Sequence, residues 1–289
     1  MNAVELKGLC KKYKSKKSST REFELKDVSL TLPYGCIMGL IGENGAGKST
    51  TISLMLDIIE KDKGEISLLG CNTAEERVKA KDDIGVVLDE PCFPIYFTAV
   101  QINKIMKSTY SKWNEEQFFS YLERFDIDQK KIVKKLSKGM KMKLSIAVAL
   151  SHSAKLLIMD EPTSGLDPVV RNEIVEILHE FTREPSNSVL ISSHIVSDLE
   201  KLCDYVAFIH KGRVVLCDEK DRLLERYATV HCTAEEFGRI EPSSVKGSIE
   251  THYGVDAVIE RTAIPDGMDF EPVSMEELFV LFVKNRHLS

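Results

Sequence analysis

Two short segments combine residue types that bind phosphate and activate water. The first, GENGAGKS at residues 42–49, fits the pattern G-x-x-x-x-G-K-[ST], whose glycines let backbone N–H groups turn toward a phosphate. An apolar run precedes it and a helical pattern follows, so the partial positive charge of a helix N-terminus would face the anion. Lys48 is placed to reach the β and γ oxygens, and Ser49 to ligate Mg²⁺. The segment predicts a nucleotide-phosphate site.

The second segment, LLIMDE at residues 156–161, ends an apolar run with two adjacent carboxylates. In P-loop enzymes the acid at such a strand end holds Mg²⁺, which assigns that role to Asp160. Glu161 then lies one residue nearer the γ-phosphate, where it can polarise the attacking water as a general base. By itself a DE pair after a strand is equally well explained as a solvated turn. The phosphate loop upstream favours the catalytic interpretation.

The elements that must position these residues alternate between strands and helices. A helical pattern runs from Lys48 toward Gly64, whose glycine is a stop signal, and another helix is expected at about 168–182. Alternation of strands and helices predicts an α/β fold with a mainly parallel sheet. Period-two patterns and short apolar runs predict strands at residues 4–13, 23–32, 36–42, 156–161, 188–193, 205–210 and 213–218.

Two segments depart from this alternation. Residues from about 97 to 151 are polar with a helical period, which predicts an inserted helical subdomain. Residues 219–289 show a weaker, mixed pattern that ends in the apolar helix face of SMEELFVLFVKN. We therefore expect a main domain over residues 1–218 and a small α+β appendage over residues 219–289.

Composition limits the classes of protein that remain. At 289 residues and 43% hydrophobic side chains the chain can bury a full core, and no run approaches the roughly 18 to 20 apolar residues of a membrane helix. The start lacks a secretory-signal pattern, so a cytoplasmic chain is expected.

A net charge of −6 argues against general binding to nucleic acid, and the lysine-rich run at residues 11–17 is interpreted as a solvated loop. Seven cysteines without a CxxC pair predict reduced, mostly buried thiols.

The order of the motifs resembles that of ATP-binding-cassette (ABC) proteins. GENGAGKS resembles the Walker A motif and LLIMDE the Walker B motif. LSKGM at residues 136–140 resembles the family signature, SGLD at residues 164–167 the D-loop, and His194 the switch histidine. The resemblance covers residues 3–218, about three quarters of the chain. It implies a P-loop NTPase with a mainly parallel sheet, an antiparallel β subdomain, the inserted helical subdomain and the C-terminal α+β appendage.

The resemblance also implies a head-to-tail dimer in which each ATP lies between the Walker A motif of one chain and the signature of the other. His194 would contact the γ-phosphate and orient Glu161, and Asp167 would bridge the dimer. Tyr13 matches an aromatic residue that stacks on adenine, although a tyrosine packed on its own sheet explains that position nearly as well. The implied catalytic residues are Lys48, Glu161 and His194. The implied Mg²⁺ ligands are Ser49, Asp89 and Asp160. The implied ATP-binding residues are Tyr13, Gly42, Glu43, Asn44, Gly45, Ala46, Gly47, Lys48, Ser49, Thr50, Ser137, Gly139 and Asp167.

Three positions depart from the family pattern. Asp89 in IGVVLDEP stands where the family's Gln loop has glutamine, and a shift of one residue would place Glu90 there instead. A carboxylate can still ligate Mg²⁺, but it adds charge to the site. The signature carries Lys138 and Met140 in place of the commoner glycine and glutamine, while Ser137 and Gly139 remain. Lys138 either adds a cation near the γ-phosphate or faces solvent.

The function implied is that of an ATP-hydrolysing subunit, at the inner face of the cell membrane, that powers an integral membrane permease of exporter type. Its partner cassette would be a second copy or a different ATPase. An ATPase that acts on nucleic acid or ribosomes is disfavoured by the single cassette, the acidic balance and the absence of heptads or a metal cluster in the sequence. A noncatalytic regulatory subunit is favoured by Asp89 and disfavoured by Glu161 with His194.

Overall fold

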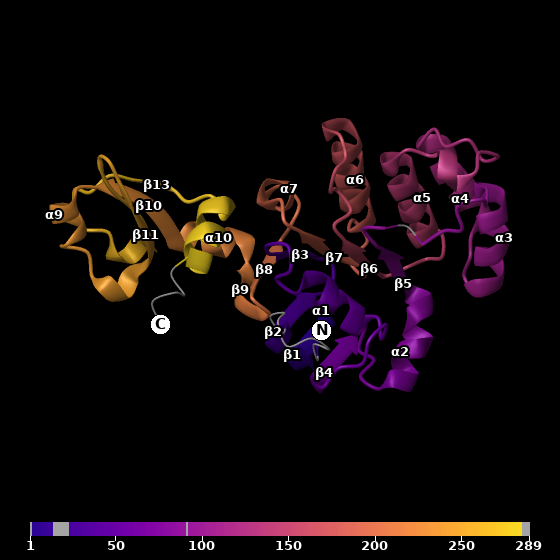
Figure 1. Ribbon diagram of the computed structural model, residues 1–289, viewed down its shortest axis with the longest axis horizontal. Helices are drawn as coiled ribbons and strands as arrows, with labels where there is room; N and C mark the ends of the chain where they lie inside the picture. Colours follow the sequence, from indigo (N-terminus) through magenta and orange to yellow (C-terminus); the bar gives the residue numbers. More distant parts are fainter. Residues whose placement is uncertain (1, 14–22, 91, 285–289) are drawn as a thin grey trace.

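The computed structural model describes residues 2–13, 23–90 and 92–284. Within them the strands form three sheets, and Figure 1 shows the smallest and largest sheets on one side of the molecule and the C-terminal sheet on the other. Lys11 and Lys12 of the expected lysine-rich loop belong to the first strand instead, and residues 14–17 lie outside the described residues. The α/β fold class expected from the sequence is confirmed.

The largest sheet has the strand order β5-β6-β7-β3-β8-β9 and is parallel except for its last pair. Side chains along β3, β6 and β7 are all buried, which explains why their sequences are continuous rather than alternating apolar runs. The strands span β3 (Ile37–Ile41), β5 (Ile84–Val87), β6 (Leu156–Asp160), β7 (Ser188–Ser193), β8 (Tyr205–His210) and β9 (Arg213–Glu219).

The second sheet is the antiparallel subdomain, with the order β2-β1-β4. Its buried side chains share one core with the inner side of the large sheet and with α1. The strands span β1 (Asn2–Lys12), β2 (Glu24–Pro33) and β4 (Lys63–Leu68), and the associated helices span α1 (Lys48–Met55), α2 (Ala74–Ala80) and the short η1 (Lys81–Asp83).

The first helix is shorter than the sequence pattern predicts. It ends at Met55, and Gly64 lies in β4 rather than at a helix end, so the stop signal assigned to this glycine is wrong. Gly64 has φ +95, and a Cβ atom there would lie only 2.5 Å from the carbonyl oxygen of Gly8. The glycine is therefore explained by the close approach of β4 to β1.

Three helices occupy the segment expected to form a helical subdomain. Each begins at a polar N-cap, Thr98, Asn114 or Ser137, whose side chain accepts a hydrogen bond from a backbone N–H of the first turn. The helices span α3 (Ala99–Thr109), α4 (Glu115–Arg124) and α5 (Lys138–Leu150), with η2 (Val133–Lys135) before α5. Two further helices, α6 (Pro168–Phe181) and α7 (Val196–Glu200), follow β6 and β7 and cover the large sheet (Figure 1).

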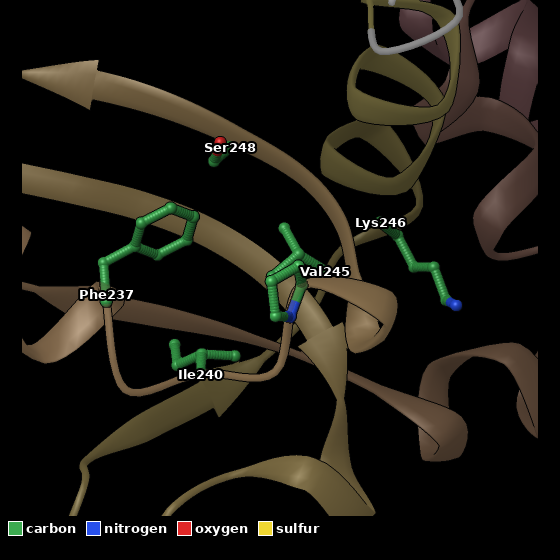
Figure 2. Close-up of a pocket in the computed structure, with 7 residues that line it drawn as sticks. Phe237, Ile240, Val245, Lys246 and Ser248 are labelled. Carbon is green, nitrogen blue, oxygen red and sulfur yellow. The ribbon is translucent and has the colours of Figure 1, made fainter. Parts of the chain in front are cut away.

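The C-terminal segment forms an antiparallel sheet of order β11-β12-β10-β13. A pocket on it is lined by Phe237, Ile240 and Val245, with Lys246 at its rim (Figure 2). The elements span α8 (Lys220–Arg226), β10 (Tyr227–Cys232), α9 (Ala234–Phe237), η3 (Pro242–Ser244), β11 (Val245–Thr251), β12 (Gly254–Glu260), η4 (Arg261–Ala263), β13 (Phe270–Pro272) and α10 (Met275–Lys284).

The last helix, α10, packs back onto the large sheet. Its Phe279 ring meets Phe208 of β8 edge to face, with centroids 5.3 Å apart, and Leu278 is fully buried in the same core. The apolar helix face predicted from SMEELFVLFVKN is thus the face that contacts the main domain.

Two expectations about the whole chain are tested by the structure. All seven cysteines are free thiols, but only Cys203 and Cys232 are buried, so the expectation of mostly buried thiols is wrong. Of the remaining cysteines, Cys10, Cys36 and Cys71 are half-buried, and Cys92 and Cys217 are exposed. None of the helices in the described ranges is long and apolar enough to cross a membrane.

Candidate functional site

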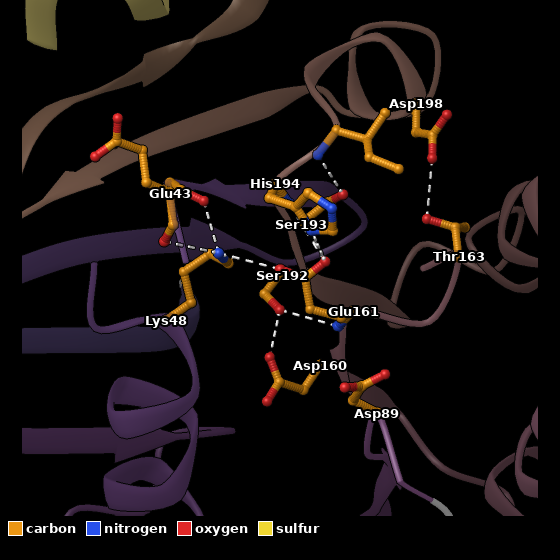
Figure 3. Close-up of polar contacts among 12 residues, drawn as sticks. Glu43, Lys48, Asp89, Asp160, Glu161, Thr163, Ser192, Ser193, His194 and Asp198 are labelled. Carbon is orange, nitrogen blue, oxygen red and sulfur yellow. Dashed lines mark hydrogen bonds and ion pairs between the residues drawn. The ribbon is translucent and has the colours of Figure 1, made fainter. Parts of the chain in front are cut away.

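The residues singled out in the sequence gather at one edge of the large sheet. The phosphate loop follows β3, Asp160 and Glu161 end β6, and His194 follows β7. Because these strands are parallel neighbours, their carboxyl ends meet at the same edge. Asp89 comes two residues after β5, whose pairing with β6 ends at Val87 opposite Met159, so it lies at the same edge of the sheet. Figure 3 shows this edge from the phosphate loop to Asp89.

The phosphate loop has the backbone geometry that its glycines predict. Gly47, the N-cap of α1, has φ +118, and a Cβ atom there would lie 2.8 Å from Leu25 and 3.1 Å from Phe23. Gly45 has φ +80 at the exposed tip, so both glycines adopt the left-handed region that other residues disfavour. Of the remaining predicted residues, Gly42 and Ala46 are buried, Thr50 is half-buried, and Glu43, Asn44 and Ser49 are exposed.

Three of the predicted catalytic side chains form a continuous row. The ammonium of Lys48 lies 3.0 Å from Glu161 Oε1, and it also donates hydrogen bonds to the carbonyl oxygens of Gly42 and Glu43 at 2.6 and 3.3 Å. The other carboxylate oxygen of Glu161, Oε2, lies 2.7 Å from His194 Nδ1. Lys48 and Glu161 are only 5% and 9% exposed. Buried charges persist when they are paired and hydrogen-bonded, as these are.

Ser192 is a site residue that the sequence reasoning missed. Its hydroxyl donates to Asp160 Oδ1 at 2.5 Å and accepts from the backbone N–H of Glu161 at 3.0 Å (Figure 3). Glu161 adopts φ +50, an unusual value for a residue with a side chain. The hydrogen bond from its N–H to Ser192 helps to hold this conformation. The two serines before His194 in the sequence ISSH could have indicated this role, because they stand at the end of a predicted strand.

Tyr13 contacts the ring of Phe23, which in turn lies beside the phosphate loop. It packs against Phe23 with centroids 6.3 Å apart, and Phe23 borders the backbone of Gly47. Tyr13 is 41% exposed, so part of its surface is accessible. This position suits an adenine contact and a packing role alike.

The signature and D-loop residues stay apart from the row formed by Lys48, Glu161 and His194. Ser137 caps α5 by accepting from the N–H of Met140, and Asp167 caps α6 by accepting from the N–H of Val169 and Val170. Gly139 lies in the first turn of α5. Within the described ranges no hydrogen bond or ion pair joins Ser137 or Asp167 to Lys48 or Glu161.

A second network that the sequence did not reveal connects the D-loop with the segment after His194. Asp198 of α7 accepts hydrogen bonds from Thr163 Oγ1 and from Arg171 of α6, both at 3.0 Å. Arg171 also donates to the carbonyl oxygen of Leu166 at 3.4 Å. The side chain of Asp198 is only 8% exposed. Asp198 therefore links the segments that carry Glu161, Asp167 and His194.

The predicted magnesium ligands have the right chemistry for the ion. Ser49 offers a hydroxyl in the first turn of α1, and Asp89 and Asp160 offer carboxylates from neighbouring strand ends. Mg²⁺ prefers such hard oxygen ligands and is usually held by one or two carboxylates together with substrate phosphates and water. The donor set therefore fits Mg²⁺.

Comparison with known proteins identifies the family of the chain. The family model described as ABC transporter matches residues 25–164. The lantibiotic transport ATP-binding protein SrtF of Streptococcus pyogenes is 36% identical over 71% of this chain and 89% of its own length. The bacitracin transport ATP-binding protein BcrA of Bacillus licheniformis is 35% identical over 73% of this chain and 68% of its own length. A solved ATP binding subunit of an ABC transporter has a TM-score of 0.68 and 28% identity, and it covers 76% of this chain and 91% of its own. The chain therefore belongs to the ABC transporter family, as an ATP-binding subunit with ATPase activity.

Proposed function

We propose that this ATPase dimerises around MgATP and powers export through a separate membrane permease. The observation that carries the proposal is the row of Lys48, Glu161 and His194 at the carboxyl edge of the sheet. In the proposal, Lys48 is the phosphate-binding cation, Glu161 the general base and His194 the imidazole that orients it, and their consecutive contacts support these roles.

The proposed chemistry depends on an exchange of partners at Lys48. Its ammonium contacts Glu161 and two backbone carbonyls in this structure, and it would turn to the β and γ oxygens of ATP. Glu161, released from Lys48 and still held by His194, would accept a proton from the attacking water. Mg²⁺ held by Ser49, Asp89 and Asp160 would neutralise phosphate charge. The remaining catalysis is positioning and charge stabilisation by fixed groups.

The proposed dimer follows from the separation of the signature from the phosphate loop. Ser137 is exposed at the start of α5, where its hydroxyl and the helix N-terminus suit an anion. In the described chain Ser137 caps α5 and Lys48 contacts Glu161, and in the proposal a second cassette adds its own Ser137 and Gly139 to the site. Asp167 would bridge the two chains, which are either identical or different.

The proposed permease contact lies near the helical subdomain. Ile95 and Tyr96, between Asp89 and α3, are 49% and 66% exposed. Exposed apolar side chains of this kind favour a protein partner. We propose that the subunit lies at the inner face of the cell membrane. The helical subdomain of about residues 97–151 would transmit motion to the permease. Residues 1–218 would form the ATPase domain, and residues 219–289 an appendage. The bacitracin and lantibiotic transport proteins support this transport class.

The test is the molar mass of the Glu161→Gln variant, measured by light scattering with and without MgATP. This change keeps the shape of the side chain but removes the base, so we expect ATP-dependent dimers and an ATPase rate reduced about 100- to 10,000-fold. Glu176→Gln, an exposed change on α6, is the matched control and should behave as the unmodified chain. A variant that binds ATP but remains monomeric would indicate a different partner cassette. A chain that does not bind ATP would contradict the proposal.

A further inference from the structure

Two of the residues that depart from the family pattern, Asp89 and Lys138, lie next to each other in space. Asp89 comes two residues after β5, and Lys138 is the first residue of α5. Their side chains form an ion pair with Lys138 Nζ 3.7 Å from Asp89 Oδ1. Asp89 and Lys138 each add a charge to the family pattern, and the charges are opposite. The pair therefore joins the loop of a proposed Mg²⁺ ligand to the helix of the signature.

Lys138 also lies against the D-loop. A Cβ atom at Gly165 would be 3.2 Å from the ammonium of Lys138, and Gly165 has φ +67. The lysine thus lies between the loop after β5 and the segment at residues 164–167. Three segments of the proposed ATP site meet at this one cation.

The exposure of Lys138 and Asp89 to water determines how strong their ion pair is. The side chains of Lys138 and Asp89 are 51% and 50% exposed. Ion pairs so open to water contribute little to folding and are screened by salt. The pair is therefore weak enough for another cation to displace. A divalent ion on the Asp89 carboxylate would also repel the nearby ammonium.

We propose that Lys138 is a positioning residue that competes with Mg²⁺ for the carboxylate of Asp89. While the pair is intact, the Lys138 ammonium occupies the Asp89 carboxylate. When Asp89 ligates Mg²⁺, Lys138 is released from it at the start of α5, the helix of the signature. The inference rests on the proposed function, because it assumes that Asp89 is a Mg²⁺ ligand in the ATP site.

The test is a Mg²⁺ titration of the binding of a fluorescent ATP analogue, which measures binding and not hydrolysis. Lys138→Gln removes the competitor, so its Mg²⁺ midpoint should fall about two- to five-fold, the range expected for an exposed pair. Lys138→Arg keeps the charge and should keep the midpoint. Lys135→Gln is the matched control, since it removes the same charge from an exposed lysine with no ion pair in the described part of the chain.

The role of Asp89 is tested in the same assay. In an Asp89→Asn background, Lys138→Gln should leave the midpoint unchanged, and high salt should shrink the difference between the unmodified chain and Lys138→Gln. An unchanged or raised midpoint in Lys138→Gln, or an equal fall in both backgrounds, would overturn the inference while leaving the proposed function intact. Failure of the unmodified chain to bind the analogue at any Mg²⁺ concentration would overturn both.

Discussion

Two histidine–carboxylate pairs of equal length lie in two different regions of the molecule. At the sheet edge, His194 Nδ1 lies 2.7 Å from Glu161, and in the C-terminal sheet His231 Nδ1 lies 2.7 Å from Asp256. The carboxylate side chains differ in exposure, at 11% for Glu161 and 44% for Asp256. The first pair continues into Lys48, whereas the second is open to water.

The difference shows that distance alone does not identify a catalytic pair. Glu161 is held by a cation on one oxygen and a histidine on the other, in a place where solvent screens little. Such an arrangement costs desolvation and is expected where chemistry requires it. Asp256 and His231 have no comparable cost, because water solvates both. The surface pair also has a third group, the exposed Glu271, whose carboxylate lies 4.0 Å from His231 Nε2. Burial of the carboxylate and of its third partner, Lys48, therefore separates the candidate active site from an ordinary surface contact.

The strongest test of this comparison is Lys48→Met, which removes the third partner. We expect MgATP binding and hydrolysis to fall at least about 100-fold, since the phosphate cation is lost. The free energy of unfolding, measured with urea, should fall by about 3 kcal/mol, because the Glu161 carboxylate stays buried with less compensation. Adding Glu161→Gln should restore part of that stability without restoring binding. Equal stability of the single variant and the unmodified chain would contradict the buried-pair interpretation.

The next test asks how firmly the C-terminal region is joined to the main domain. Leu278→Ala removes a fully buried side chain from α10 and should lower the free energy of unfolding by about 3 kcal/mol. Glu276→Ala, an exposed change on the same helix, should have an effect below about 0.5 kcal/mol. Denaturant unfolding curves of the two variants measure both free energies of unfolding. Matching values for the two variants would mean that α10 contributes no essential packing.

A smaller effect is expected at Asp198, which links the buried site to the D-loop. Asp198→Asn weakens the contacts to Thr163 and Arg171 and should lower the free energy of unfolding by about 1–3 kcal/mol. The ATPase rate should fall with it, while affinity for ATP stays within about two-fold, because the phosphate loop is untouched. Steady-state kinetics and nucleotide titration separate the two quantities. Loss of ATP affinity with a normal rate would assign Asp198 a different role.

The smallest effect is expected from the exposed pair. The hydrogen bond to Asp256 raises the pKa of His231 above its usual value of about 6.5. A raised pKa in the folded state means that the contribution to stability is complete below about pH 6.5 and is lost as pH rises through the raised pKa. His231→Gln should therefore lower the free energy of unfolding by less than about 1 kcal/mol at pH 5 and have no effect near pH 9. Unfolding curves at both pH values measure this, and a pH-independent difference would rule out the charge as its cause.

Much of the fold was predictable because its signals are local. Buried parallel strands such as β6 and β7 require continuous apolar runs, and N-caps such as Ser137 and Asp167 require short polar side chains at a helix start. Prediction failed where a residue is explained by its contact with a segment distant in sequence. Gly64 is explained by the backbone of Gly8, which no local pattern reveals.

The sequence by itself determined the α/β class and the phosphate loop, because glycines, a lysine and a hydroxyl at fixed spacing have local consequences. The partners of these residues were decided by the tertiary structure alone. Strand order brings Lys48 to Glu161 and Ser192 to Asp160, and the packing of α5 beside β5 brings Lys138 to Asp89. These pairings depend on which strands and helices are neighbours, and spacing along the chain carries no information about that arrangement.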